Sequence, residues 1–192
     1  MKKRKEDDFY CYRSADVNGP LQTHLLAKET ATLLEKRSLE IPFLSFLFAG
    51  DRRALDPQKV HKIMVNGFKK LNSFVYLEED TDLDYLKQFG GNPKKVKSHN
   101  KKDKIYGQSH LSLITPPKDF YYGKSGIYRD CEHYPEKSKD FKNCKSEGFD
   151  NKVWIGEATK KNLKKGLMRR LRYNPLWKTM LKEIKKHLIA TE

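Results

Sequence analysis

The stretch IPFLSFLFAGD, residues 41–51, decides the fold that this sequence predicts. It is almost continuously apolar until Gly50 and Asp51 end it, which is typical of a strand buried on both faces of a parallel sheet. Asp56 and Pro57 then provide a helix N-cap and a first helical residue. The chain is therefore expected to run from a strand through a loop into a helix.

Apolar periodicity predicts helices on both sides of this strand. Leucines recur at near-helical spacing from about residue 21 to residue 36, which indicates an amphipathic helix. A final helix is expected to begin at Asn174-Pro175. In the helix after Pro57, one face is apolar and consists of Val60, Ile63, Met64, Val65, Phe68 and Leu71.

Two further strands are expected, at 73–77 and at 104–107, with a polar excursion between them. Strands that alternate with helices predict an α/β protein, with about three parallel strands, flanking helices and a loop-rich C-terminal region. We expect one domain over residues 1–192, in which residues 1–20 form an irregular N-terminal segment.

The chain is basic, with a formal net charge of +15 over 192 residues. The excess is concentrated in residues 94–104 and 160–187. Such clusters suggest a small basic module that binds nucleic acid or an anionic surface, which is our alternative function. A solvated face is favoured over a nucleic-acid partner, because no aromatic residue interleaves the lysines of 94–104 and no nucleic-acid motif is present.

The sequence shows no transmembrane segment and no secretory signal. No apolar run is long enough to cross a membrane, and the basic start of the chain is followed by Glu6-Asp7-Asp8 instead of an apolar region. Three cysteines are too few for a disulfide scaffold and fit a reducing compartment with at most one bridge. We therefore expect a cytoplasmic location.

Cys131, His133 and Cys144 leave two alternatives open. They could hold a metal ion with one further ligand, or the two cysteines could form a disulfide. The spacing matches no zinc signature, and packing of His133 among its aromatic neighbours is the simpler interpretation. We expect neither a metal nor a cofactor.

Two side chains that can carry chemistry follow the predicted strands. Asp51 comes just after the apolar strand, and His110 just after the third expected strand. Because functional side chains collect beyond the carboxyl ends of parallel strands, these two residues could converge. Asp51 would orient the imidazole, and His110 would act as a base. The alternatives are a cap or surface charge for Asp51 and a structural role for His110.

The order of these features resembles the C-terminal half of an α/β-hydrolase of the lipase/esterase type, in a bacterial branch of that superfamily. The resemblance covers about residues 10–190 and rests on residues 12–26, 41–51, 75–77, 107–113, 116–117, 120–123, 128–134, 154–157 and 171–175. It implies a serine esterase that cleaves ester or acyl substrates, with Asp51 as the triad acid and His110 as the triad base. Asp56 is the competing acid, although capping the helix at Pro57 is the favoured role for it.

The nucleophile of that family is missing from the sequence. The resemblance implies a Gly-x-Ser-x-Gly turn upstream of the acid, and the chain contains none. The nearest string, GKSG at 123–126, lies after His110 and lacks the spacing, so Ser125 is not expected to be the nucleophile. Without this turn there is neither a nucleophile nor a complete oxyanion hole. We therefore expect the chain to be inactive alone, or a truncated remnant.

The resemblance also predicts an exposed edge. The strands present would be the last three of the sheet, which leaves the strand at 42–49 without a neighbour on one side. An apolar edge strand favours association. The expected partner is a separately encoded N-terminal hydrolase half, or a second copy of the chain joined through this strand.

Overall fold

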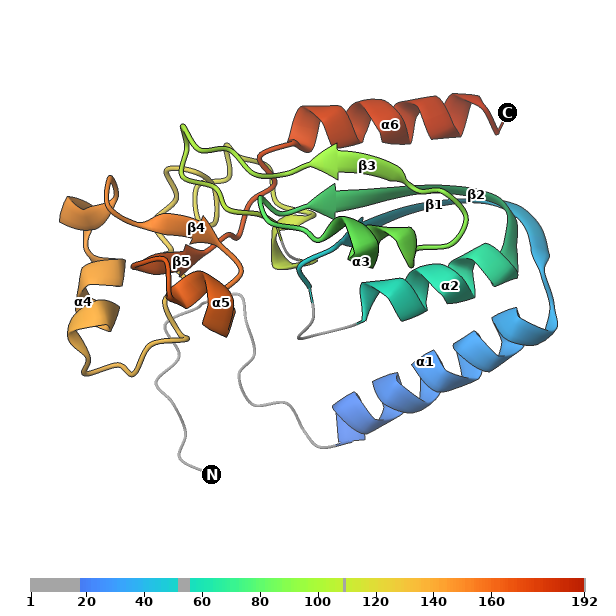
Figure 1. The fold of residues 1–192 in the computed structure, drawn as a ribbon, viewed down its shortest axis with the longest axis horizontal. Helices are drawn as coiled ribbons and strands as arrows, with labels where there is room; N and C mark the ends of the chain where they lie inside the picture. The colour runs from blue at the N-terminus through green and yellow to red at the C-terminus, as the bar shows by residue number, and fades with distance from the viewer. Residues whose placement is uncertain (1–17, 52–55, 109, 192) are drawn as a thin grey trace.

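The computed structural model describes residues 18–51, 56–108 and 110–191 (Figure 1). We call one part the sheet region; it comprises α1 (Asn18–Lys36), β1 (Leu39–Phe48), α2 (Pro57–Gly67), β2 (Phe68–Leu77), α3 (Leu83–Lys87), β3 (Lys94–Lys97) and α6 (Trp177–Ile189). We call residues 128–171 the disulfide lobe; it comprises α4 (Lys139–Lys145), η2 (Glu147–Phe149), β4 (Trp154–Gly156), α5 (Lys160–Leu163) and β5 (Met168–Arg170). Between them lies a loop-rich segment with the short helix η1 (His110–Ser112). Helices and parallel strands make the chain a mixed α/β protein.

The sheet region is built on three parallel strands in the order β1-β2-β3. The register sets Phe46 opposite Phe74 and Phe48 opposite Tyr76. Both aromatic pairs stack, with ring centroids 5.2 Å apart in each. Most of the apolar run at 41–49 therefore lies in a strand of a parallel sheet, as predicted, but the strand is exposed at its start and buried only toward its carboxyl end.

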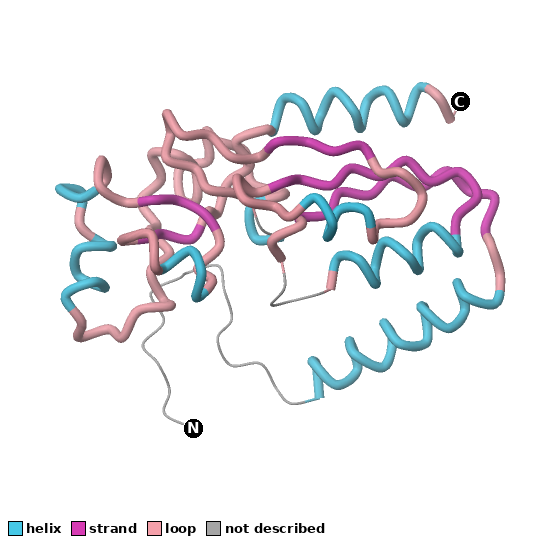
Figure 2. The backbone as a smooth tube through the Cα atoms, in the orientation of Figure 1, coloured by secondary structure: helices cyan, strands magenta, loops and turns pink. Residues whose placement is uncertain are grey.

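Helices cover both faces of this sheet (Figures 1 and 2). α2 and α3 lie on one face, with α1 packed against α2, and α6 lies on the other. The core on the first face consists of Leu47, Ala49, Val75, Leu86 and Phe89. The core on the second face consists of Phe48, Phe74 and Tyr76, with Leu113 and Leu176 packed against them.

The predicted extent of the helix after Pro57 is wrong. The helix ends at Gly67, and Phe68 already begins β2. The Phe68 ring stacks on Phe43 of β1 at 4.0 Å, so cross-strand packing determines its conformation. Leu71, which the helical periodicity included, lies in β2 as well.

The predicted strand at 104–107 is also wrong, because β3 takes the third place in the sheet. Ile105 instead forms isolated bridges with Asn100 and Ile155. β3 escaped prediction because three of its four residues are lysines. Only Val96 packs on the core, while Lys94 Nζ lies 4.9 Å from the centre of the Phe74 ring.

α1 and the start of β1 expose apolar side chains. Each of the following is more than half exposed: Leu21, Leu25, Leu26, Leu33 and Ile41. α1 does contact α2, because a side chain at Gly67 would collide with Leu34. Within the described residues β1 pairs with β2 alone, so β1 is an edge strand. None of the described helices combines the length and apolar character needed to cross a membrane.

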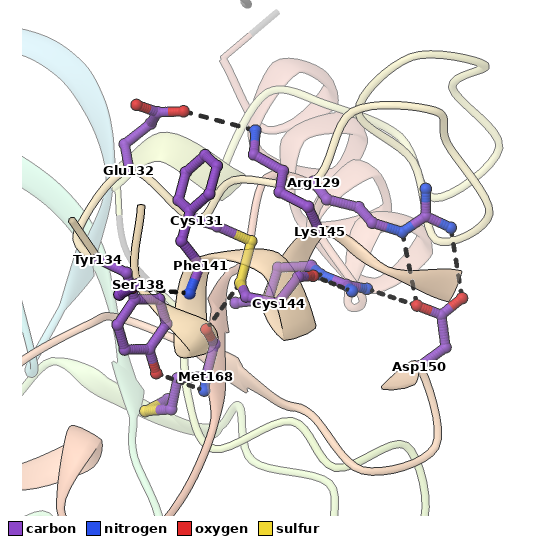
Figure 3. The surroundings of a disulfide bond; sticks show 11 residues. Arg129, Cys131, Glu132, Tyr134, Ser138, Phe141, Cys144, Lys145, Asp150 and Met168 are labelled. Carbon is purple, nitrogen blue, oxygen red and sulfur yellow. Dashed lines mark hydrogen bonds and ion pairs between the residues drawn. A yellow bond between two sulfur atoms is a disulfide. The ribbon is translucent and has the colours of Figure 1, made fainter. Parts of the chain in front are cut away.

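The disulfide lobe is held by a covalent bond and by polar contacts (Figure 3). Cys131 and Cys144 form a disulfide, with their Cα atoms 6.0 Å apart. The Met168 backbone N–H donates to the Tyr134 hydroxyl over 3.0 Å. The Arg169 guanidinium donates to the Cys144 carbonyl oxygen over 3.1 Å and so joins β5 to α4.

This disulfide decides between the two alternatives for Cys131 and Cys144. A metal site would need both thiolates, and the bond takes them up. His133 instead packs on Tyr134, with ring centroids 4.1 Å apart. Disulfides are typical of oxidising compartments, so the cysteine count no longer supports the expected cytoplasmic location, which stays a prediction. Across the described ranges, no group of three or more His, Cys, Asp or Glu side chains is placed to hold a metal ion.

Candidate functional site

Asp51 lies in the turn that follows β1. The Ala49 N–H donates to the Tyr76 carbonyl over 2.9 Å, which extends the ladder between β1 and β2 by one residue. The Asp51 N–H then donates to the Phe48 carbonyl over 3.1 Å and closes the turn. These bonds place the Asp51 side chain at the carboxyl edge of the sheet, where it is only 2% exposed.

Buried amides hold the segment that carries His110. The Gln108 amide donates to the Asn174 side-chain oxygen over 2.9 Å. The Asn174 side-chain amide in turn donates to the Leu113 carbonyl over 3.2 Å, and its backbone N–H donates to Thr115 over 2.8 Å. The chain is therefore fixed on both sides of His110 by one residue just before α6.

The structure brings Asp51 and His110 together across 59 positions of sequence. His110 Nδ1 lies 2.5 Å from Asp51 Oδ2, and the His110 backbone N–H donates to the same oxygen over 3.3 Å. A buried carboxylate is costly unless it is hydrogen-bonded. These two donors satisfy Oδ2, while Oδ1 is buried without a hydrogen-bond partner among the described residues. The His110 side chain is 37% exposed, so the pair is buried at the carboxylate and accessible at the imidazole.

This geometry determines the state of the imidazole. An ionised carboxylate only accepts hydrogen bonds, so the ring nitrogen facing it must carry the hydrogen. The other nitrogen, Nε2, then holds the lone pair of a neutral ring. His110 is thus arranged to accept a proton at Nε2, while Asp51 stabilises the imidazolium that results.

Glu78 also lies at this edge and was not singled out from the sequence. It directly follows β2, and its carboxyl group occupies the space where a side chain at Gly50 would lie. A Cβ at Gly107 would lie 2.5 Å from Glu78 Cγ. Glu78 therefore fills the gap between the segments that carry Asp51 and His110. Its position after a predicted strand is the signal by which it could have been found.

The other sequence candidates lie elsewhere. Asp56 Oδ1 accepts from the backbone N–H groups of Gln58 over 3.1 Å and Lys59 over 3.3 Å, so it caps α2. Ser125 is exposed in the turn at 123–126, where it lines a cavity beside the disulfide lobe. The acid that contacts His110 is Asp51, and the catalytic roles of both residues stay predictions.

A second serine–histidine contact lies inside the sheet region. His61 Nε2 of α2 lies 2.8 Å from Ser73 Oγ of β2, and both residues are buried. Burial also lowers the pKa of His61, which keeps the ring neutral. Because no solvent reaches His61, this pair is structural and offers no surface to a substrate.

Comparison of the chain with protein-family models, with curated proteins and with solved structures finds no match. The geometry of Asp51 and His110 is therefore the feature of the structure that points to a function.

Proposed function

We propose that the chain is the C-terminal part of an α/β-hydrolase-like serine esterase or lipase, with Asp51 as its acid and His110 as its base. The observation that carries this proposal is the contact of 2.5 Å between Asp51 Oδ2 and His110 Nδ1 at the carboxyl edge of a parallel sheet. An orienting carboxylate on one nitrogen and an accessible second nitrogen are the two features that a triad base requires.

In the proposed reaction, His110 Nε2 removes the proton from a serine hydroxyl as the serine oxygen attacks the ester carbonyl carbon. The ester C–O bond then breaks, and the imidazolium donates its proton to the departing alkoxide. Water then attacks the acyl carbon while His110 Nε2 takes its proton. The imidazolium returns that proton to the serine oxygen as the bond between the serine and the acyl group breaks. Asp51 stays ionised throughout and stabilises the imidazolium.

The serine must come from outside the 192 residues, since they contain no Gly-x-Ser-x-Gly. The edge of β1 and the apolar side chains of α1 are the surface on which we place the missing half. Strand pairing along β1 would bring a neighbouring strand, and the helix that follows it, into the same sheet. Self-association of two copies through β1 is the competing use of this surface.

A serine-directed fluorophosphonate probe tests the first part of the proposal. The purified chain should remain unlabelled, because His110 has no activated serine to serve. Stoichiometric labelling would contradict the proposal and would identify a serine that the sequence motif did not reveal.

Complementation tests the second part. Co-expression with an N-terminal esterase half that carries Gly-x-Ser-x-Gly should give a co-purifying complex that hydrolyses p-nitrophenyl acetate. His110→Ala should lower kcat by a factor on the order of 10⁴ or more, and Asp51→Asn by about 10⁴. Lys62→Gln, at an exposed position of α2, is the control and should leave the rate unchanged. A stable complex without hydrolysis would contradict the catalytic assignment.

A further inference from the structure

A cavity of about 470 Å³ lies beside the disulfide lobe, well away in sequence from Asp51. Its walls come from residues 102–104, from the turn at 122–126 and from β5 with the residues that follow it. The volume falls within the range of about 300–1,000 Å³ that is typical of small-molecule sites. The cavity is therefore large enough for an organic ligand, not only for a single ion.

The lining of this cavity is strongly basic. Seven basic and three acidic residues contribute to it, and two buried carboxylates that pair with lining arginines reduce the excess from four positive charges to two. One of the three acidic residues, Asp150, is already paired, with Arg169 over 2.9 Å and with Arg129 over 3.4 Å. A cavity with such an excess attracts anions, because its low-dielectric walls concentrate the field.

Two of the lining arginines form ion pairs with buried carboxylates outside the cavity. Arg170 pairs with Glu157 over 3.0 Å, and Arg172 pairs with Asp130 over 3.3 Å. Neither acid lines the cavity, and their side chains are only 1% and 3% exposed. Buried carboxylates that fix guanidinium groups reduce the conformational entropy that a ligand would otherwise have to overcome.

Two hydrogen-bond donors of the lining residues have no acceptor among the described residues. They are Arg170 Nε and the Tyr173 hydroxyl, and both are buried. Burial raises the pKa of Tyr173 to about 12, so the hydroxyl keeps its proton at neutral pH. Unsatisfied buried donors are rare and costly, and an anion would satisfy both of these.

Aromatic rings complete the lining. Tyr122 and Tyr128 both contribute to the wall, and the Arg172 guanidinium lies 4.7 Å from the centre of the Tyr122 ring. These rings give the cavity an amphipathic wall that suits a sugar or nucleoside ring beside a charged group.

We propose that this cavity binds an organic phosphate, a phosphomonoester carried on a sugar or nucleoside, with the phosphate held by Arg170, Arg172 and the Tyr173 hydroxyl. Guanidinium groups match phosphate oxygens in pairs, and a dianion suits the charge excess. The site is separate from the Asp51–His110 pair and does not depend on the proposed esterase function.

Isothermal titration calorimetry on the full chain tests this proposal. The probes are AMP and glucose 6-phosphate, with inorganic phosphate and adenosine as comparisons. At least one ester should bind with a Kd below about 1 mM at about 50 mM NaCl and more weakly at about 300 mM. Binding of AMP alone would assign a nucleoside, and binding of glucose 6-phosphate alone a sugar.

Two variants place the ligand. Arg170→Gln and Tyr173→Phe should each weaken binding about tenfold, because each removes a hydrogen bond to a charged group. Tyr173→Phe removes only a hydroxyl, so it keeps the test valid if Arg170→Gln does not fold. The control Lys62→Gln also removes one positive charge, but on α2, and should change the Kd less than about twofold.

Three results would overturn the proposal. One is a Kd above about 1 mM for both esters. Another is an equal loss of affinity in Lys62→Gln and Tyr173→Phe, which would indicate attraction by overall charge alone. The last is that inorganic phosphate binds as tightly as both esters. This result would show that the sugar or nucleoside part of the ester makes no contact with the cavity.

Discussion

The sheet region and the disulfide lobe are stabilised by different interactions. The interior of the sheet region is mainly apolar and aromatic, with Val75 fully buried and Phe74 stacked on Phe46. The disulfide lobe also buries apolar side chains, among them Val153, Met168 and Leu171, but it adds a disulfide and two buried carboxylates, Asp130 and Glu157, on arginine partners. Buried ion pairs add little net stability, although breaking them is costly. The sheet region therefore depends on apolar volume for its stability, whereas the disulfide lobe depends on its cross-link in addition to apolar contacts.

The largest expected effect is the loss of an aromatic side chain from the sheet core. Phe74→Ala should lower the free energy of unfolding by about 3–5 kcal/mol, because it removes apolar contacts and leaves a cavity between β1 and β3. Phe120→Ala is the control, since Phe120 is 70% exposed, and it should stay within about 0.5 kcal/mol of the wild type. Urea denaturation measures both. Equal losses would show that the sheet core does not dominate stability.

Removal of the disulfide should have the next largest effect, in the other region. The bond closes a loop over a sequence separation of 13, so Cys131→Ser with Cys144→Ser should cost about 3 kcal/mol. Hydrogen exchange should quicken in residues 131–171 and stay unchanged in β1 and β2. Wild-type protein with a reductant should reproduce this pattern. Faster exchange throughout both regions would contradict the separation between them.

A pH effect is expected to come from the sheet region. Burial lowers the pKa of His61 from 6.5. Below about pH 6.5 the His61 imidazole therefore binds a proton in the unfolded chain but stays neutral in the folded protein. The free energy of unfolding should therefore fall as the pH drops through this range, by at most about 1.4 kcal/mol per pH unit for one proton. His61→Gln should remove this component, while His24→Gln, at an exposed position of α1, should retain it. Unchanged pH dependence in His61→Gln would refute the assignment.

The smallest effect concerns the cap of α2. Asp56→Ala should cost about 1 kcal/mol, since Asp56 accepts from two backbone N–H groups at the helix start. Glu29→Ala, at an exposed position of α1, serves as the control for loss of a carboxylate. Asp56→Ala also tests whether Asp56 or Asp51 is the acid that contacts His110, because only a change at Asp51 should alter the NMR signals of the His110 ring. Altered His110 ring signals in Asp56→Ala would contradict the choice of Asp51 as the acid.

Sequence reasoning succeeded where burial leaves a pattern along the chain. The apolar run at 41–49 predicted a strand, and the rule for carboxyl ends placed Asp51 at the edge of the sheet. The expectation for His110 relied on a strand at 104–107 that the structure does not contain, and the loop that follows β3 brings His110 to Asp51 instead. Sequence reasoning failed at β3, because an edge strand of lysines with only Val96 in the core carries no apolar signal. The helix after Pro57 was extended too far because Phe68 fits a helical face as well as a strand.

The supports of the candidate site could not have been predicted from local patterns. Gln108 bonds Asn174 across 66 positions, and such a contact between two amides leaves no periodic trace. The Cys131–Cys144 bond remained one of two alternatives, because spacing alone does not separate a disulfide from a metal site. Glu78 was within reach of the reasoning, since it follows a predicted strand as Asp51 does.

The protonation of the His110 ring tests the central claim most directly. Long-range ¹H–¹⁵N correlation spectra of the histidine rings, recorded at alkaline pH, report which nitrogen carries the hydrogen. The Asp51 contact predicts a neutral ring with the hydrogen on Nδ1 and a bare Nε2, and Asp51→Asn should shift the hydrogen toward Nε2. Hydrogen on Nε2 in the wild-type protein, unchanged in Asp51→Asn, would contradict the assignment of Asp51 and His110 as an acid–base pair.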